Sequence, residues 1–177
     1  MFARVAGALA LKNLNIVGAQ IHADDHTKAL EVLHVADADD EDAEIDWPPV
    51  IELIEEILST DDDLTPRFEA RERAILRRVV RAPQSIESVR VDFDNEVSAE
   101  STIIEVAGPD RLGLLYELSS TLTAAGLDTQ QARVQTVGDD VVDSFYVQTL
   151  DEQKLTDPEA QAELRHALLA VMAPRDT

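Results

Sequence analysis

The 177-residue sequence contains no cysteine and no long apolar run. The absence of cysteine excludes a disulfide framework, a thiolate metal site and a cysteine nucleophile. No window approaches the roughly 20 consecutive apolar residues that a membrane span needs. The first residues, Met1-Phe2-Ala3-Arg4, lack the basic segment, apolar core and cleavage site of a secretory signal. We therefore expect a soluble, cytoplasmic protein.

Basic residues are scarce: 15 Lys and Arg stand against 36 Asp and Glu, which gives a net charge of −21. The summed field of such a chain repels phosphate, so neither nucleic acid nor an anionic membrane is an expected partner. Apolar residues nevertheless make up 45% of the chain, which is enough to build one core or two small ones.

Hydrophobic periodicity in the first half predicts a helix, a two-stranded hairpin, an acidic loop and a second helix. These elements span residues 1–12, 16–23 with 29–36, 37–46 and 50–59. The loop carries seven acids in ten positions, so like-charge repulsion keeps it solvated. Pro48-Pro49 precedes the second helix, as is typical of a helix start.

The middle of the chain is predicted to be a basic linker helix, from Thr65 as N-cap and Pro66 as first helical residue to about Arg81, with Pro83 ending it. It holds six of the fifteen basic residues. Because its neighbours are acidic, internal salt bridges are favoured over a nucleic-acid site.

The second half is predicted to contain four strands and two helices. The strands span residues 89–93, 102–106, 129–136 and 141–149, and the first helix spans 114–125, with Gly126 as its stop. Asp157 and Pro158 supply the N-cap and the first residue of the final helix.

The two halves repeat one another at an offset of 113 residues. The repeat aligns Phe2 with Leu115, Val5 with Leu118, Leu9 with Leu122, Ala19 with Ala132 and Ile21 with Val134. A duplicated unit of this kind predicts an α+β fold of two ferredoxin-like domains, the first lacking its opening strand. The expected boundaries are 1–63, a linker at 64–85, and 86–177. We expect residues encoded upstream, or another chain, to supply the missing strand, since its loss leaves a neighbouring strand unpaired.

One stretch, Ile103 to Tyr116, is predicted to be a buried strand, a tight loop and the first turn of a helix. Backbone N–H groups at a helix N-terminus favour the carboxylate of a small ligand. The alternative is that Gly113 only lets the loop turn beneath a structural helix, and the spacing leaves both open.

The same stretch, with Val141-Val142-Asp143-Ser144-Phe145-Tyr146-Val147, resembles the ACT domain, a module that usually binds amino acids. Two such domains in tandem most resemble the C-terminal regulatory region of the PII-protein nucleotidyltransferase family, the bifunctional uridylyltransferase/uridylyl-removing enzymes. The resemblance implies a βαββαβ fold, a role in nitrogen regulation, and glutamine sensing that switches attached catalytic domains acting on a PII-type protein. It implies no cofactor.

By this resemblance the ligand-binding residues are Asp110, Arg111, Leu112, Gly113, Leu114, Asp128 and Gln130, with the last two on a facing strand. Asp110 as a helix cap and Arg111 in a surface ion pair remain alternatives. The first copy has lost the loop, although Asn13 to Ile16 could still face a partner domain.

No catalytic or metal constellation is expected. His22-Ala23-Asp24-Asp25-His26 is interpreted as a turn, and Asp37-Ala38-Asp39 lacks the Gly-Ser segment of a nucleotidyltransferase. The chain is therefore predicted to be non-catalytic by itself. The rival hypotheses are an ACT-type interaction or dimerisation module with vestigial sites, and a minimal nucleotidyltransferase, which the missing segment argues against.

Overall fold

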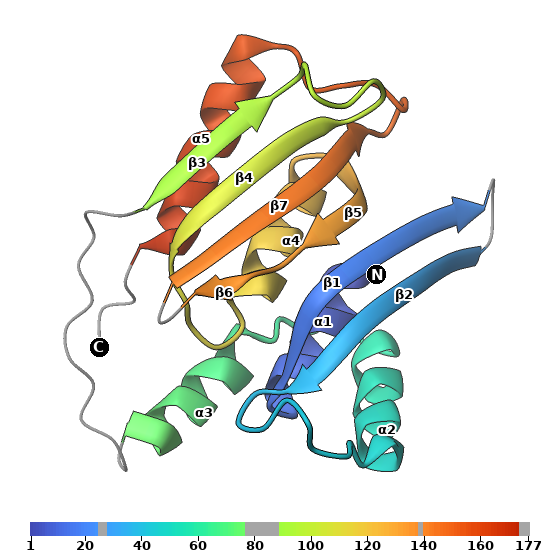
Figure 1. Ribbon diagram of the computed structural model, residues 1–177, viewed down its shortest axis with the longest axis vertical. Helices are drawn as coiled ribbons and strands as arrows, with labels where there is room; N and C mark the ends of the chain where they lie inside the picture. Colours follow the sequence, from blue (N-terminus) through green and yellow to red (C-terminus); the bar gives the residue numbers. More distant parts are fainter. Residues whose placement is uncertain (25–27, 77–88, 138–139, 174–177) are drawn as a thin grey trace.

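The computed structural model describes residues 1–24, 28–76, 89–137 and 140–173 (Figure 1). The helices are α1 (Phe2–Leu11), α2 (Trp47–Leu58), α3 (Thr65–Leu76), α4 (Leu114–Ala124) and α5 (Pro158–Met172). The strands are β1 (Leu14–Asp24), β2 (Lys28–Asp37), β3 (Arg90–Asp94), β4 (Thr102–Pro109), β5 (Leu127–Arg133), β6 (Thr136–Val137) and β7 (Asp140–Thr149). Every predicted helix and strand is present, and the α+β fold class is confirmed.

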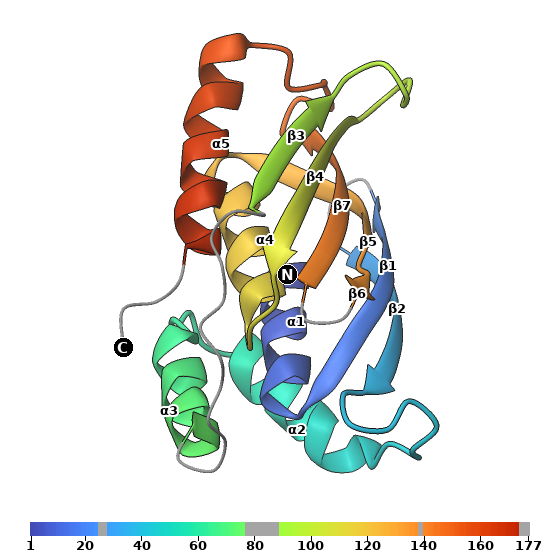
Figure 2. The same cartoon turned by 60° about the vertical axis from the view of Figure 1, so that its left-hand side comes forward.

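All the strands join one antiparallel sheet in the order β2-β1-β5-β7-β4-β3, with β6 added against β7. Helices α1, α4 and α5 cover one face of this sheet, as Figure 2 shows. The strands of the second half alternate buried and partly exposed residues, because only one face meets the helices. No described helix is long and apolar enough to cross a membrane.

The two halves meet through the strands that the repeat relates. Ala19 of β1 pairs with Ala132 of β5, and these are residues that the 113-residue offset aligns. Since β1 and β5 run antiparallel, an approximate twofold axis passes near this pair. The repeat-related helices α1 and α4 pack against one another across the same axis. The duplication therefore forms one sheet rather than two separate ones.

The second half departs from the expected βαββαβ order. Its elements run β3-β4-α4-β5-β7-α5, so the outer strand beside β4 comes from before the unit instead of after its last helix. The first half has no counterpart of β4, as predicted. As a result β2 is one of the two edge strands of the sheet, and no described strand pairs with its outer side.

Helix ends mostly follow the predicted chemistry. Asp157 Oδ1 accepts a hydrogen bond from the Glu159 N–H at 3.2 Å, and Gly126 follows α4 with a φ of 74°. At the start of α3 the cap differs from the prediction. Asp63 Oδ1 accepts from the N–H and the hydroxyl of Thr65, at 3.0 and 2.8 Å, so Asp63 does the capping.

Helix α2 begins at Trp47, three residues before the predicted start, with Pro48 and Pro49 inside its first turn. Prolines fit there because their missing N–H groups would have no helical acceptor. The predicted end of the linker helix at Arg81 and its stop at Pro83 lie outside the described residues. In the described part of α3, Arg67 forms the expected ion pair, with Glu56 at 2.6 Å.

Two apolar clusters hold the molecule together. The larger lies between the sheet and the covering helices, and includes Leu9, Ile104, Leu118, Phe145 and Leu168. The smaller joins α1, α2, α3 and α4; its buried members are Ala3, Ala8, Ile57, Leu64, Phe68 and Tyr116. Through this second cluster the linker helix packs against the loop that precedes α4.

Candidate functional site

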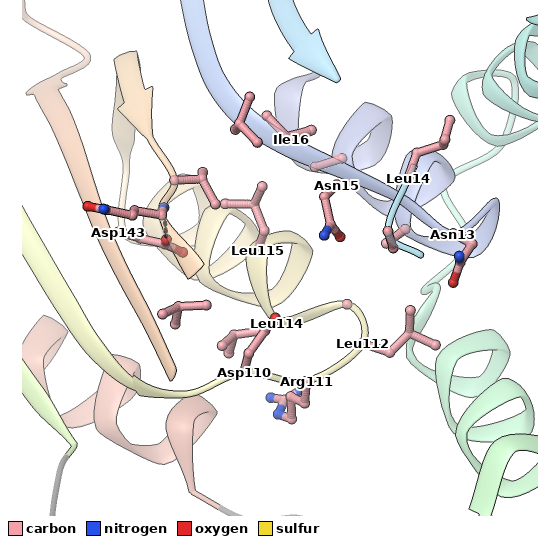
Figure 3. Close-up of a pocket in the computed structure, with 18 of the residues that line it drawn as sticks. Asn13, Leu14, Asn15, Ile16, Asp110, Arg111, Leu112, Leu114, Leu115 and Asp143 are labelled. Carbon is pink, nitrogen blue, oxygen red and sulfur yellow. Dashed lines mark hydrogen bonds between the residues drawn. The ribbon is translucent and has the colours of Figure 1, made fainter. Parts of the chain in front are cut away.

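A cavity of about 680 Å³ lies where β1 of the first half faces the β4–α4 loop of the second (Figure 3). Its lining combines apolar residues with a substantial polar and charged group. The polar and charged lining residues are Asn13, Asn15, Glu41, Glu72, Asp110, Arg111, Gln135 and Asp143. A hollow between two structural units that combines apolar surface with convergent polar groups is typical of a small-molecule site.

The N-terminus of α4 forms one wall of the cavity. Gly113 is its N-cap residue and has no side chain to cap the helix. Asp110 precedes this helix start and lines the cavity. First-turn N–H groups of a helix carry partial positive charge and suit a carboxylate. Leu114 and Leu115, in that first turn, line the cavity.

Gly113 has a structural reason to be glycine. Its φ is 79°, in the left-handed region, and a Cβ placed there would lie 2.6 Å from Cδ2 of Phe68. Phe68 belongs to α3 and is fully buried. The close approach at Gly113 is thus to an aromatic ring of the linker helix. Leu112, also in the loop, packs against the same small cluster.

Arg111 forms a largely buried ion pair with Glu117, where a surface pair was the alternative. The two side chains are 13% and 14% exposed. The Nη2 group also donates to the Val171 carbonyl at 2.7 Å, near the end of α5. In Figure 3 the Arg111 side chain extends from the loop on the side away from Asn15. Its guanidinium therefore ties the loop to α4 and α5.

The strand that faces the loop is β1, not the segment near Asp128. Asp128 is exposed, and the Gln130 side chain donates to its carboxylate at 3.1 Å. Gln130 lines a second, shallower hollow with Ser98 and Tyr146. Neither residue lines the cavity, so the structure does not bring them together with the Asp110–Leu114 loop. The edge-to-edge pairing of β1 with β5 accounts for this, because it places the first half opposite the loop.

The first-half wall is formed by the segment after α1, which the sequence suggested could face another domain. Asn13 has a φ of 63°, and its Nδ2 donates to Asp39 at 2.9 Å. Arg71 of α3 donates to the Leu11 carbonyl and, at 3.5 Å, to Asn13 Oδ1. Helix α3 thus contacts both walls: Phe68 beneath the loop and Arg71 at the end of α1.

Asp143 was not among the predicted site residues. It lies on β7, lines the cavity and is 1% exposed. Burial raises its pKa to about 7, and the nearby Asp110 carboxylate adds to the rise. A usable signal was present in the sequence. Asp143 is the charged residue in an alternating strand whose inward positions are otherwise Val141, Phe145 and Val147.

The described residues contain no group of three or more His, Asp or Glu side chains placed to hold a metal ion. His26, part of the rejected metal motif, lies outside the described residues. Two charged pairs lie at or beside the cavity instead: Asp110 with Asp143, and Arg111 with Glu117. Such groups can bind and orient a small ligand.

Comparison with known proteins shows which proteins this chain is similar to. Residues 90–174 match the family described as ACR9-like, ACT-like domain. The chain is 37% identical over 174 residues to the bifunctional uridylyltransferase/uridylyl-removing enzyme of Gluconobacter oxydans, covering 96% of this chain and 18% of that protein.

The enzymes of the same name from Rhodospirillum rubrum and Azospirillum brasilense are 32% and 36% identical, over 97% and 98% of this chain. In each case the chain spans 18% of the relative's length. No solved structure matches it significantly. The chain is therefore a homologue of one region of the bifunctional uridylyltransferase/uridylyl-removing enzymes, with an ACT-like domain in its second half.

Proposed function

We propose that the chain is a regulatory module that binds a small amino acid in the cavity between β1 and the β4–α4 loop. The observation that carries the proposal is that a helix N-terminus with glycine as its N-cap residue faces a cavity built from both halves of the duplication. A ligand there contacts the two halves and, through α3, their linker, so its binding can change their relative arrangement. By resemblance to the relatives, glutamine is the proposed ligand.

In a longer protein this module would pass the ligand signal to attached catalytic domains. The relatives' name describes uridylyl transfer and removal, and the chain matches only 18% of their length. We propose that the chain alone carries out neither reaction, and that its regulated partners are those catalytic domains and, through them, a PII-type protein. We also propose that the module is cytoplasmic. Its two domains would span residues 1–63 and 86–177, joined by the linker at 64–85.

Calorimetric titration of the folded chain with the twenty standard amino acids tests the proposal. We expect at least one, glutamine foremost, to bind with a Kd in the micromolar-to-millimolar range. If none binds to a sample whose circular dichroism shows a folded α+β protein, the sensing function is overturned.

The second candidate is an interaction module in which the cavity is vestigial. The observation that favours it is the unpaired edge of β2, where Leu30 and Val32 are 62% and 43% exposed. An open, partly apolar edge strand is a template for pairing with another strand. This candidate predicts assembly that amino acids do not affect.

The two candidates are better separated by a cavity residue than by Gly113→Val. A side chain at Gly113 collides with Phe68, so that substitution disturbs the fold as well as the cavity. Asn15→Leu changes a lining side chain that is exposed and for which the structure gives no hydrogen bond to another described residue. A sensor loses ligand affinity in this variant, whereas an interaction module keeps its assembly state.

A further inference from the structure

Asp143 is a charged group inside the cavity that the loop motif does not explain. We propose that its carboxylate anchors the ammonium group of the bound ligand, while the α4 N-terminus holds the ligand's carboxylate. This inference rests on the proposed function and deepens it. The site would then select α-amino acids over carboxylic acids that lack an ammonium group.

The hydrogen bonding of Asp143 leaves room for a ligand. Its Oδ1 accepts from the Gln135 N–H at 3.4 Å, a long contact, and within the described residues the carboxyl has no other hydrogen bond. The side chain is 99% buried yet lines the cavity. A buried carboxyl with so little support is costly to ionise unless a cation reaches it.

The surrounding charges call for a cationic group. Asp110, Glu72 and Glu41 also line the cavity, and the Asp110 carboxylate acts on Asp143. Arg111 is the basic residue of the lining; its Nη2 pairs with Glu117 and the Val171 carbonyl, and within the described residues its Nε and Nη1 are buried without a hydrogen-bond partner. Acidic side chains outnumber the basic one in this lining, which favours a ligand with a cationic group.

The cavity lining includes two groups of opposite polarity. The α4 N-terminus carries partial positive charge, and Asp143 on β7 carries negative charge when it is ionised. A zwitterion carries a group that suits each of them. A nucleotide does not, because its phosphates are repelled by the acidic residues of the lining.

Ligand binding by this route is linked to protons. Near neutral pH the buried Asp143 carboxyl is partly protonated, and it must ionise to hold an ammonium group. Binding of an amino acid therefore releases a proton from the protein, and affinity falls as pH decreases below about 7.

The test compares L-glutamine with glutaramate, which is glutamine without its α-ammonium group, on the wild-type chain and two variants. Asp143→Asn keeps the shape of the side chain and removes its charge. Asp128→Asn is the matched control, since Asp128 is exposed and lines no part of the cavity. If another amino acid binds more tightly in the panel, that acid and its ammonium-free counterpart replace the pair.

We expect wild type and Asp128→Asn to prefer glutamine over glutaramate by at least about 10-fold, the scale of one charge-assisted contact. Asp143→Asn should lose that preference and bind both acids with similar weak affinity. Retention of the preference in Asp143→Asn would overturn the role of Asp143 and leave the sensing function intact. Failure of every amino acid to bind wild type would overturn the proposed function itself.

A measurement on wild type alone keeps the inference testable if the variant misfolds. Titrations at pH 7 in two buffers of different ionisation enthalpy report the protons exchanged. Glutamine should release about half a proton per site, because the carboxyl is then about half protonated, and glutaramate should release none. Equal proton exchange for the two acids contradicts the ammonium–Asp143 contact.

Discussion

Two glycines have nearly the same backbone conformation but different surroundings, so comparing substitutions at them distinguishes backbone strain from overpacking. Gly113 and Gly126 have φ values of 79° and 74°, so a side chain costs similar backbone energy at either site. A Cβ at Gly113 would lie within 3 Å of the Phe68 ring, whereas nothing lies within 4 Å at Gly126. The demand for glycine in the loop thus comes partly from the linker helix.

We expect Gly113→Ala to lower the free energy of unfolding by about 3 kcal/mol, the sum of left-handed strain and overpacking against a buried ring. Gly126→Ala should cost about 1 kcal/mol, from strain alone. Urea denaturation of both variants checks this. Equal losses at the two sites would mean that Phe68 moves aside freely.

Asp143 makes stability depend on pH in a defined direction. Its pKa is about 7 in the folded chain and near 3.8 when exposed, so between these values the folded state keeps a proton that the unfolded state has lost. This contribution to stability falls as pH rises from about 4 to 7 and is constant above.

Asp143→Asn should therefore be more stable than wild type above pH 7, by at most about 4 kcal/mol, with the difference shrinking toward pH 4. Urea midpoints of the two proteins at pH 5 and pH 8 measure this difference and remove the effect of the overall charge, which both share. A difference that grows as pH falls would contradict the raised pKa.

Among the elements, α3 is more than a linker. Phe68 fills the space beneath Gly113 and packs at a tilt against Tyr116, with ring centroids 5.5 Å apart. Tyr116 Oη in turn accepts from the Leu64 N–H at 3.3 Å. Arg71 reaches the end of α1. A single helix therefore fixes the distance between the two walls of the cavity.

We expect Phe68→Ala to destabilise the chain by about 3–5 kcal/mol, because it opens a hole in a fully buried cluster. It should also raise hydrogen exchange in α3 and in the Asp110–Leu114 loop together. Arg73→Ala is the control on the same helix. Arg73 is exposed and its ion pair with Glu69 is 3.9 Å long, so the change should stay within about 0.5 kcal/mol. Loop exchange unchanged in Phe68→Ala would show that α3 does not brace the loop.

At the scale of the whole molecule, one continuous sheet runs through both halves, and its two edges differ: the second half has the additional strand β3, and the first half has no counterpart of it among the described residues. The β1–β5 pairing joins the halves, while β3 pairs with the edge of β4 and no described strand pairs with the outer side of β2. The net charge of −21 opposes self-association of isolated chains, and the open edge favours it.

Replacing both Leu30 and Val32 by lysine should weaken self-association without loss of stability, since both side chains are exposed and inward-facing core residues are untouched. Light scattering across a concentration series at high salt, where charge repulsion is screened, provides the measurement. Unchanged assembly in the double variant would exclude the β2 edge as the contact.

The sequence predicted the elements of this protein because their signals are local. The apolar repeat of α1, the alternation in β7 and the cap at Asp157 depend on neighbours in the chain, and the 113-residue repeat identified the duplicated unit. The loop from Asp110 to Leu114 was likewise visible, since its residues are contiguous. Its proposed role as the ligand loop still depends on the binding experiment.

Only the tertiary structure decided which surfaces face that loop. The pairing of Ala19 with Ala132 brings β1 opposite it and leaves Asp128 and Gln130 elsewhere, and the packing of Phe68 turns a linker into a wall. Asp143 gains its raised pKa from burial by segments distant in sequence. Such features arise from long-range packing, which no local periodicity encodes, whereas helices and strands follow from the hydrogen-bonding and side-chain periods of the chain itself.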